Sequence, residues 1–299
     1  MYFDSQQAIR PTVSREIFDG VHVAGYGTPI NWSLSSLQRL CDRLCADKAP
    51  LVARISEVLW HHNLGMAFAP SANQFNALVA HCEEFTSQGT IPFSWRDNAR
   101  AKLLRGIFAD GIEIPPNTGT RKNAYMMSSA DCALIVIKLE TRQGPDRVFA
   151  SHAGRASLYN PKRGNGMHSI VHELVKTFST EERKRLRVWV GFSMNPGAHF
   201  SHTRTDSRFP DNGSMVDTIR RNYGNSCFRD DGDSYSQGWL DLKELIVRQF
   251  EKVDVQRNNI TKDSVCTHTD VYGSGSYVWN SESRSPKQGL RNLIIAYRD

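Results

Sequence analysis

Short runs of apolar and often β-branched residues recur from about residue 124 to the end of the chain, and each is bounded by turn-forming residues. Runs of this kind are typical of β-strands. The stretch CALIVI, which begins at Cys132, is apolar at every position and predicts a strand that is covered on both faces. The predicted strands lie at 124–127, 132–139, 147–151, 186–194 and 292–297.

Apolar residues spaced by three and four predict helices in other parts of the chain. The clearest such helix lies at 167–178 and another lies at 242–253. Three further helical patterns fall between residues 35 and 85. We therefore expect an α+β fold, with a large mixed sheet and flanking helices. We expect one domain over 1–299, with a helical insertion or cap at 35–85.

Charge and composition indicate which kinds of partner the protein binds. The net charge is +6, from 37 basic and 31 acidic residues. The basic residues are scattered and do not alternate with aromatic residues, so we expect no nucleic-acid partner. An anionic small-molecule substrate, phosphate included, fits this mild excess.

The sequence also bears on location. It contains no apolar run of membrane-spanning length and no leader pattern at its start, so we expect no membrane partner. The six cysteines include no CxxC pair, which is typical of free thiols in the cytoplasm.

One cysteine and one histidine stand at the edges of neighbouring predicted strands. Cys132 begins the apolar run, and His152 ends the next run and enters a glycine turn. A thiol beside an imidazole is a nucleophile with its base, although the same two side chains are also zinc ligands. A third reading is a buried cysteine with a hydrogen-bonded histidine. Asp131 either orients His152 or caps the turn.

The sequence around this pair resembles the YfiH-like or laccase-domain proteins. The hallmark of that family is an ADC motif followed by a strand that ends in HAG, and the chain has SADC and VFASHAG. The resemblance covers roughly 90–299. Other matching segments, in the family's order, are GIFADGIEI (106–114), WVGFSMNPGAHF (189–200), GWLDLKELIVRQF (238–250), VCTHTD (265–270), GSYVW (275–279) and QGLRNLIIAY (288–297).

The resemblance implies a YfiH-like fold, which is shared with the cytotoxic necrotizing factor toxins. It also implies one of two chemistries. YfiH-like proteins act on purine nucleosides by phosphorolysis or deamination and hold zinc with two histidines and one cysteine, which would make Cys132 and His152 metal ligands. The toxins use a Cys–His pair without metal to deamidate a glutamine.

The chain departs from the zinc pattern. The family's first histidine is missing, and Asn98 or Asp97 occupies its place, with Asn98 a candidate substrate-binding residue. His199 is a candidate ligand or substrate-binding residue, so zinc remains an open prediction with an unidentified third ligand. Copper is not expected, because too few histidines can be assembled. The HAGWRG motif is altered to HAGRAS, in which Arg155 is a candidate for binding a phosphate or carboxylate.

Three hypotheses follow. In the first, the protein is a YfiH-like enzyme that acts on a purine nucleoside or similar small substrate through Cys132 and His152. In the second, it is a metal-free amidase or deamidase in which Cys132 attacks an amide carbonyl and His152 transfers the proton, with backbone amides stabilising the oxyanion. In the third, it is a non-catalytic relative that serves as a binding module.

Overall fold

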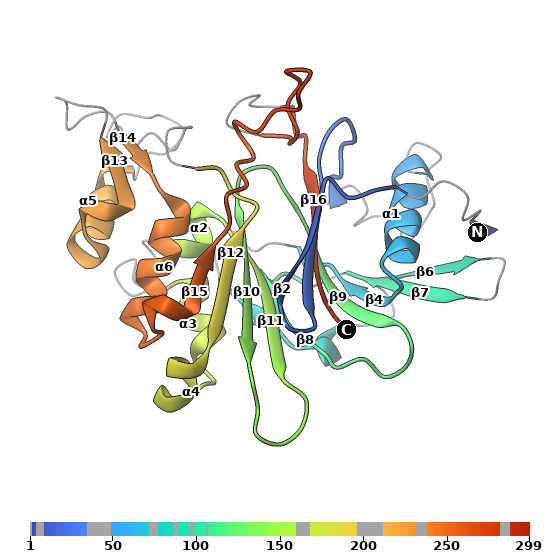
Figure 1. The fold of residues 1–299 in the computed structure, drawn as a ribbon, viewed down its shortest axis with the longest axis horizontal. Helices are drawn as coiled ribbons and strands as arrows, with labels where there is room; N and C mark the ends of the chain where they lie inside the picture. Colours follow the sequence, from blue (N-terminus) through green and yellow to red (C-terminus); the bar gives the residue numbers. More distant parts are fainter. Residues whose placement is uncertain are drawn as a thin grey trace.

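A computed structural model gives the fold of the chain (Figure 1). It describes residues 2–3, 9–34, 49–71, 77–85, 89–95, 99–105, 107–159, 168–195, 212–230, 238–281 and 288–299.

Two mixed β-sheets form the centre of the molecule. The larger sheet has eight strands, in the order β1 (Tyr2–Phe3), β6 (Thr90–Trp95), β7 (Arg100–Leu104), β4 (Leu64–Phe68), β9 (Lys122–Ser129), β16 (Asn292–Arg298), β3 (Val21–Tyr26) and β2 (Val13–Phe18). The smaller sheet has six strands, in the order β15 (Ile260–Lys262), β12 (Arg187–Gly191), β10 (Ala133–Leu139), β11 (Arg147–Ala153), β8 (Gly111–Ile114) and β5 (Val79–Ala80). A separate hairpin pairs β13 (Phe228–Asp230) with β14 (Gly238–Leu240).

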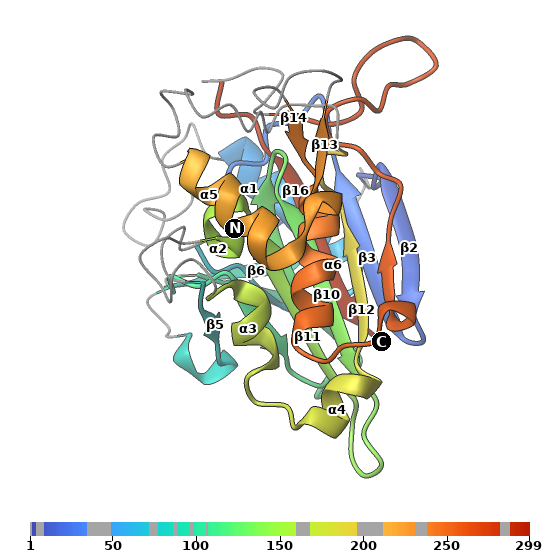
Figure 2. The same cartoon turned by 90° about the vertical axis from the view of Figure 1, so that its left-hand side faces the viewer.

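Helices cover the outer face of each sheet, and the two inner faces pack against each other. The helix α1 (Ala49–His61) lies on the larger sheet, while α3 (Ile170–Val175) and α6 (Leu242–Lys252) lie on the smaller one (Figures 1 and 2). The remaining α-helices are α2 (Arg155–Leu158), α4 (Thr180–Arg185) and α5 (Asn212–Tyr223). Short 3₁₀ turns occur at Cys82–Glu84, Asn225–Cys227 and Arg257–Asn259.

The strand β10 shows why the sequence folds into these layers. Every residue of β10 is buried. Ile135 and Ile137 pack under the helices, whereas Leu134 and Val136 face the other sheet. A strand covered on both faces is mostly apolar, as the CALIVI pattern predicts, and the buried Lys138 near its end pairs with Asp146.

The predicted α+β fold is confirmed. All five predicted strands are present, as β9, β10, β11, β12 and β16. The two predicted helices outside the insertion are also present as α3 and α6, although α3 is shorter than predicted.

The predicted helical insertion at 35–85 is wrong in part. Residues 49–61 do form α1, but Leu64–Phe68 form β4, which lies between β7 and β9 inside the larger sheet. Val79 and Ala80 form β5, because their pairing with β8 outweighs a helical spacing of apolar residues. Residues 35–48 lie outside the described part of the chain. The described part of this segment therefore contributes strands to both sheets as well as the helix α1.

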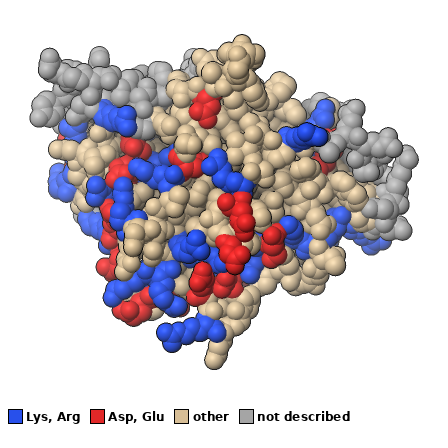
Figure 3. All heavy atoms as spheres, in the orientation of Figure 1, with Lys and Arg blue, Asp and Glu red and all other residues tan. Residues whose placement is uncertain are grey.

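The distribution of charged side chains on the surface agrees with the small positive net charge. On the face shown in Figure 3, basic and acidic side chains are intermixed, which gives no extended basic stripe among the described residues of that face. Within the described ranges, no helix has both the length and the apolar composition needed to span a bilayer.

Candidate active site

The register of two antiparallel strands brings Cys132 and His152 together. Ala133 pairs with Ala153 and Leu134 pairs with His152. Cys132 immediately precedes Ala133 and therefore lies diagonally across from His152, on the same face of the sheet. Diagonal neighbours of this kind lie within reach of long side chains.

Because Gly154 has no side chain, there is space for the side chains of Cys132 and His152 to meet. It stands opposite Cys132, one residue beyond the last pair of the ladder. A Cβ atom at Gly154 would lie 3.0 Å from the Cys132 Sγ and 3.1 Å from the His152 Cε1. The glycine of the HAG motif is therefore needed for space, since its φ of −94° is open to any residue.

Asp110 completes the site from the strand on the other side of β11. Ser151 pairs with Gly111, and the backbone N–H of His152 donates to the Asp110 carbonyl over 2.8 Å. This register places Asp110 directly opposite His152. The Asp110 Oδ1 lies 3.3 Å from the His152 Nδ1. The sequence analysis included Asp110 only within the segment GIFADGIEI and did not identify it as a site residue.

Neighbouring charge and hydrogen bonds favour the protonated form of His152, against the effect of burial. The Asp110 side chain is fully buried and that of His152 is 14% exposed. Burial by itself lowers the pKa of His152, but the charge of Cys132 and the hydrogen bonds that the imidazole donates to Asp110 and Cys132 outweigh it and raise the pKa to about 10. Burial raises the pKa of Asp110, and the hydrogen bond and charge of His152 oppose this.

A tyrosine of the larger sheet contacts the backbone of both Asp110 and His152. The Tyr125 hydroxyl on β9 donates to the Asp110 carbonyl over 2.7 Å and accepts from the His152 backbone N–H over 2.9 Å. This buried tyrosine ties β9 to both β8 and β11. The contact fixes the backbone positions from which Asp110 and His152 project.

Asp131, for which the sequence leaves orientation of His152 or capping of the turn open, is hydrogen-bonded to Thr267 in the structure. It is buried, and its Oδ1 accepts from the Thr267 hydroxyl over 2.9 Å. Its carbonyl accepts from the Ser193 hydroxyl over 2.9 Å. Asp131 thus ties the segment before Cys132 to the CTHTD segment. In the structure Asp110 is the carboxylate at the His152 ring, because the β8–β11 register and not adjacency in sequence selects the partner.

The other predicted site residues are placed as follows. Arg155 is half-buried at the start of α2, next to Gly154. Asp97, Asn98 and His199 lie outside the described residues, as does the loop around His199.

The donor set at the site does not fit a three-ligand metal centre among the residues that the structure describes. No group of three or more His, Cys, Asp or Glu side chains in that part of the chain is arranged to hold a metal ion. Asp110 is bonded to the Nδ1 of His152, so it serves the histidine as a hydrogen-bond partner. Cys132 and His152 alone are fewer donors than zinc normally takes from a protein.

Comparisons with known proteins identify a family and a fold. The family model described as multi-copper polyphenol oxidoreductase laccase matches residues 114–278, which is more than half of the chain. No curated protein sequence matches the chain.

Solved structures of similar fold are also found. The YfiH protein of Bacillus licheniformis has a TM-score of 0.60 at 14% identity, covering 94% of both chains. YlmD from Geobacillus stearothermophilus has a TM-score of 0.58 at 17% identity, covering 94% of this chain and 93% of its own. The Neisseria meningitidis protein NMB0706 has a TM-score of 0.55 at 13% identity, covering 94% and 95%.

Proposed function

The chain belongs to the multi-copper polyphenol oxidoreductase laccase family, and from the geometry of its site we propose that it is a cysteine-type amide hydrolase. The observation that carries the proposal is the alignment of Cys132, His152 and Asp110 on three adjacent strands. A nucleophile, a base and a carboxylate that orients the base form the arrangement used for acyl transfer. The family's description is that of enzymes, and this site provides a means of catalysis without a third metal ligand.

The proposed reaction proceeds through a thioester. The Cys132 thiolate attacks the amide carbonyl carbon, and the C–N bond breaks as protonated His152 gives its proton to the leaving nitrogen. Neutral His152 then takes a proton from water, whose oxygen attacks the thioester carbonyl. Cys132 leaves as the thiolate and the product is a carboxylic acid. Asp110 holds the Nδ1 of the ring, which leaves Nε2 as the atom that carries the proton.

The substrate is proposed to be a small amide, which Arg155 would help to bind. This residue lies beside Gly154 at the rim of the strand edge, and a guanidinium binds a carboxylate or phosphate on the substrate bidentately. Deamidation of a glutamine or asparagine side chain is the simplest reaction of this class.

The second candidate is the purine-nucleoside chemistry that the YfiH-like resemblance implies. One observation favours it. Cys132 and His152, the two implied zinc ligands, lie close together at the same end of the paired strands β10 and β11. On this reading the protein contains a metal and cleaves or deaminates a purine nucleoside with phosphate or water.

The test combines metal content with two activity assays. Wild type, Cys132→Ala, His152→Ala and the control Cys82→Ala are purified without a tag. Zinc is measured by mass spectrometry, ammonia release is measured with glutaminyl and asparaginyl peptides, and adenosine turnover is measured with and without phosphate. Cys82 is a matched control because it is also a half-buried free thiol.

We expect metal-free wild type that releases ammonia, with the activity lost in both site variants and kept in Cys82→Ala. One zinc per chain that is lost in both site variants, together with adenosine turnover, would overturn the amidase proposal in favour of the second candidate. Absence of both activities in folded, metal-free protein would overturn both.

A further inference from the structure

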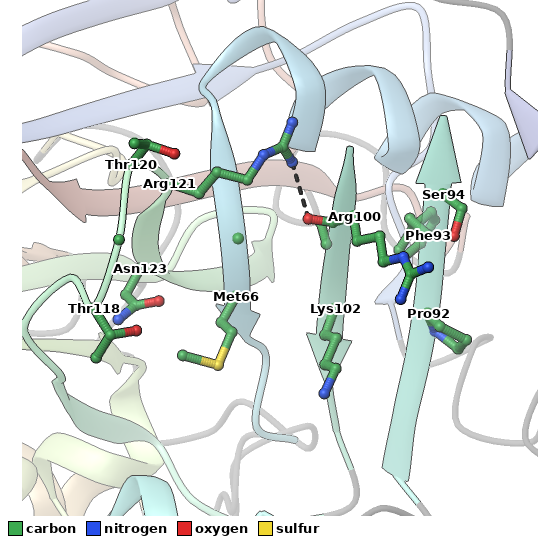
Figure 4. A pocket seen from close by; sticks show the side chains of 13 residues that line it. Met66, Pro92, Phe93, Ser94, Arg100, Lys102, Thr118, Thr120, Arg121 and Asn123 are labelled. Carbon is green, nitrogen blue, oxygen red and sulfur yellow. Dashed lines mark hydrogen bonds between the residues drawn. The ribbon is translucent and has the colours of Figure 1, made fainter. Parts of the chain in front are cut away.

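A cavity of about 560 Å³ lies on the larger sheet. Strands β6, β7, β4 and β9 form its floor (Figure 4). The registers Pro92–Lys102, Lys102–Met66 and Met66–Asn123 place four of its residues in one row across these strands. None of the three catalytic residues lines it. Its volume is that of a small-molecule site.

The charged side chains that are described at the cavity lining are all basic. Arg100 and Lys102 are both exposed and project from the same face of β7, because they are two residues apart on a strand. Among the residues that the structure describes, no acidic residue lines the cavity and neither Arg100 nor Lys102 forms an ion pair. Two unpaired cations at one concave surface focus a positive potential there.

Hydrogen-bonding groups complete the wall. Ser94, Thr118 and Thr120 bring hydroxyl groups to the cavity, and Figure 4 shows Thr118 and Thr120 on the side opposite Arg100 and Lys102. Met66 supplies an apolar surface between them. The lining thus offers a cationic end, a hydroxyl-bearing end and an apolar centre.

Arg121 also lines the cavity, and its guanidinium is held by several contacts. The guanidinium of Arg121 lies over the rings of Trp60 and Trp95, and its Nη1 donates to the carbonyls of Leu64 and Arg100 over 3.0 and 3.1 Å. These bonds hold the backbone of β4 and β7 beside the cavity. A preformed site loses less conformational entropy on binding.

We propose that this cavity binds a phosphorylated, hydroxyl-bearing small molecule of the sugar-phosphate class. Arg100 and Lys102 bind the phosphate, and Thr118 and Thr120 bind the hydroxyl groups. The cavity is a second site, distinct from the proposed catalytic one.

The test is calorimetric titration with ribose 5-phosphate, with ribose as the neutral control ligand. The proteins are wild type, Arg100→Ala, Lys102→Ala, Cys132→Ala and Lys184→Ala, in which the last removes an exposed lysine of α4 far along the chain. Each cavity variant removes a charge-assisted hydrogen bond to the phosphate and should weaken binding by at least about tenfold. Thermal unfolding confirms that each variant is folded.

We expect ribose 5-phosphate to bind to wild type, Cys132→Ala and Lys184→Ala with equal affinity and ribose not to bind. Rising salt should weaken the binding, as expected for an exposed cationic site. No binding at millimolar concentration would overturn the proposal. It would also be overturned by equal binding to both cavity variants, by loss of binding in Cys132→Ala, or by an equal loss in Lys184→Ala.

Discussion

Replacing Asp110 by asparagine tests whether the buried carboxylate activates the Cys132–His152 pair. The substitution keeps the size of the side chain and its ability to accept a hydrogen bond, and it removes the negative charge beside His152. We expect the protonated form of His152 to lose stability and the thiolate of Cys132 to lose it in turn. The rate at which Cys132 is alkylated near pH 7 should therefore fall.

The structure sets the size of the effect. Unit charges separated by the 3.3 Å between the Asp110 Oδ1 and the His152 Nδ1 interact with about 5 kcal/mol at an effective dielectric constant of about 20. The retained hydrogen bond and the relief of burying a charged Asp110 offset part of this. We expect a net loss of about 2–3 kcal/mol, which corresponds to a rate on the order of a hundredfold lower.

The assay follows alkylation by iodoacetamide in native protein. The tryptic peptide 123–138 contains Cys132 as its one cysteine, so mass spectrometry reads this thiol separately from the others. Rates are measured from pH 5 to pH 9 for wild type, Asp110→Asn and Asp131→Asn. The last variant is matched in chemistry, but it removes a carboxylate whose bond is to Thr267.

We expect Asp110→Asn to slow the reaction and Asp131→Asn to change it much less. A folded Asp110→Asn protein that reacts as fast as wild type would refute the reasoning. A slow Asp131→Asn with a normal Asp110→Asn would do so as well, and would return the orienting role to Asp131.

Three further predictions follow from single contacts. Gly154→Ala should slow Cys132 alkylation about tenfold or more with little change in urea unfolding, because its Cβ atom would lie 3.0 Å from the thiol sulfur; unchanged reactivity would show that the gap at this glycine is not needed. Burial lowers the pKa of His62 to about 3, so the stability that neutral His62 contributes is complete above pH 6.5 and is lost as the pH falls towards 3. In urea unfolding of wild type, the free energy of unfolding should therefore fall by about 2 kcal/mol from this residue between pH 6.5 and 5. The His62→Asn variant should lack this dependence of the free energy of unfolding on pH. Lys243→Met should lower the free energy of unfolding by about 3–5 kcal/mol, because it leaves the fully buried Asp263 carboxylate without the Nζ at 3.0 Å; adding Asp263→Asn should recover part of the loss, and an unchanged midpoint in the single variant would contradict the argument.

The local sequence was sufficient for the elements whose pattern is long and unambiguous. Runs such as CALIVI specify a strand buried on both faces, because no other element places so many consecutive apolar residues out of water. The segment LGMAF at 64–68 is too short for its period to be read, and the helical pattern before it led us to include this strand in a helical segment. Pairing with β7 and β9 decides its structure, and this pairing is a property of the whole sheet.

The same division holds for the site. The sequence by itself determined Cys132 and His152, because each stands where an apolar run meets a turn and the motifs SADC and HAG mark both. Only the tertiary structure selected Asp110, which is 42 residues from His152 in the chain. Sequence adjacency favoured Asp131, but a hydrogen bond depends on distance in space. That distance is set by the register of β8 against β11, which follows from the packing of the two sheets.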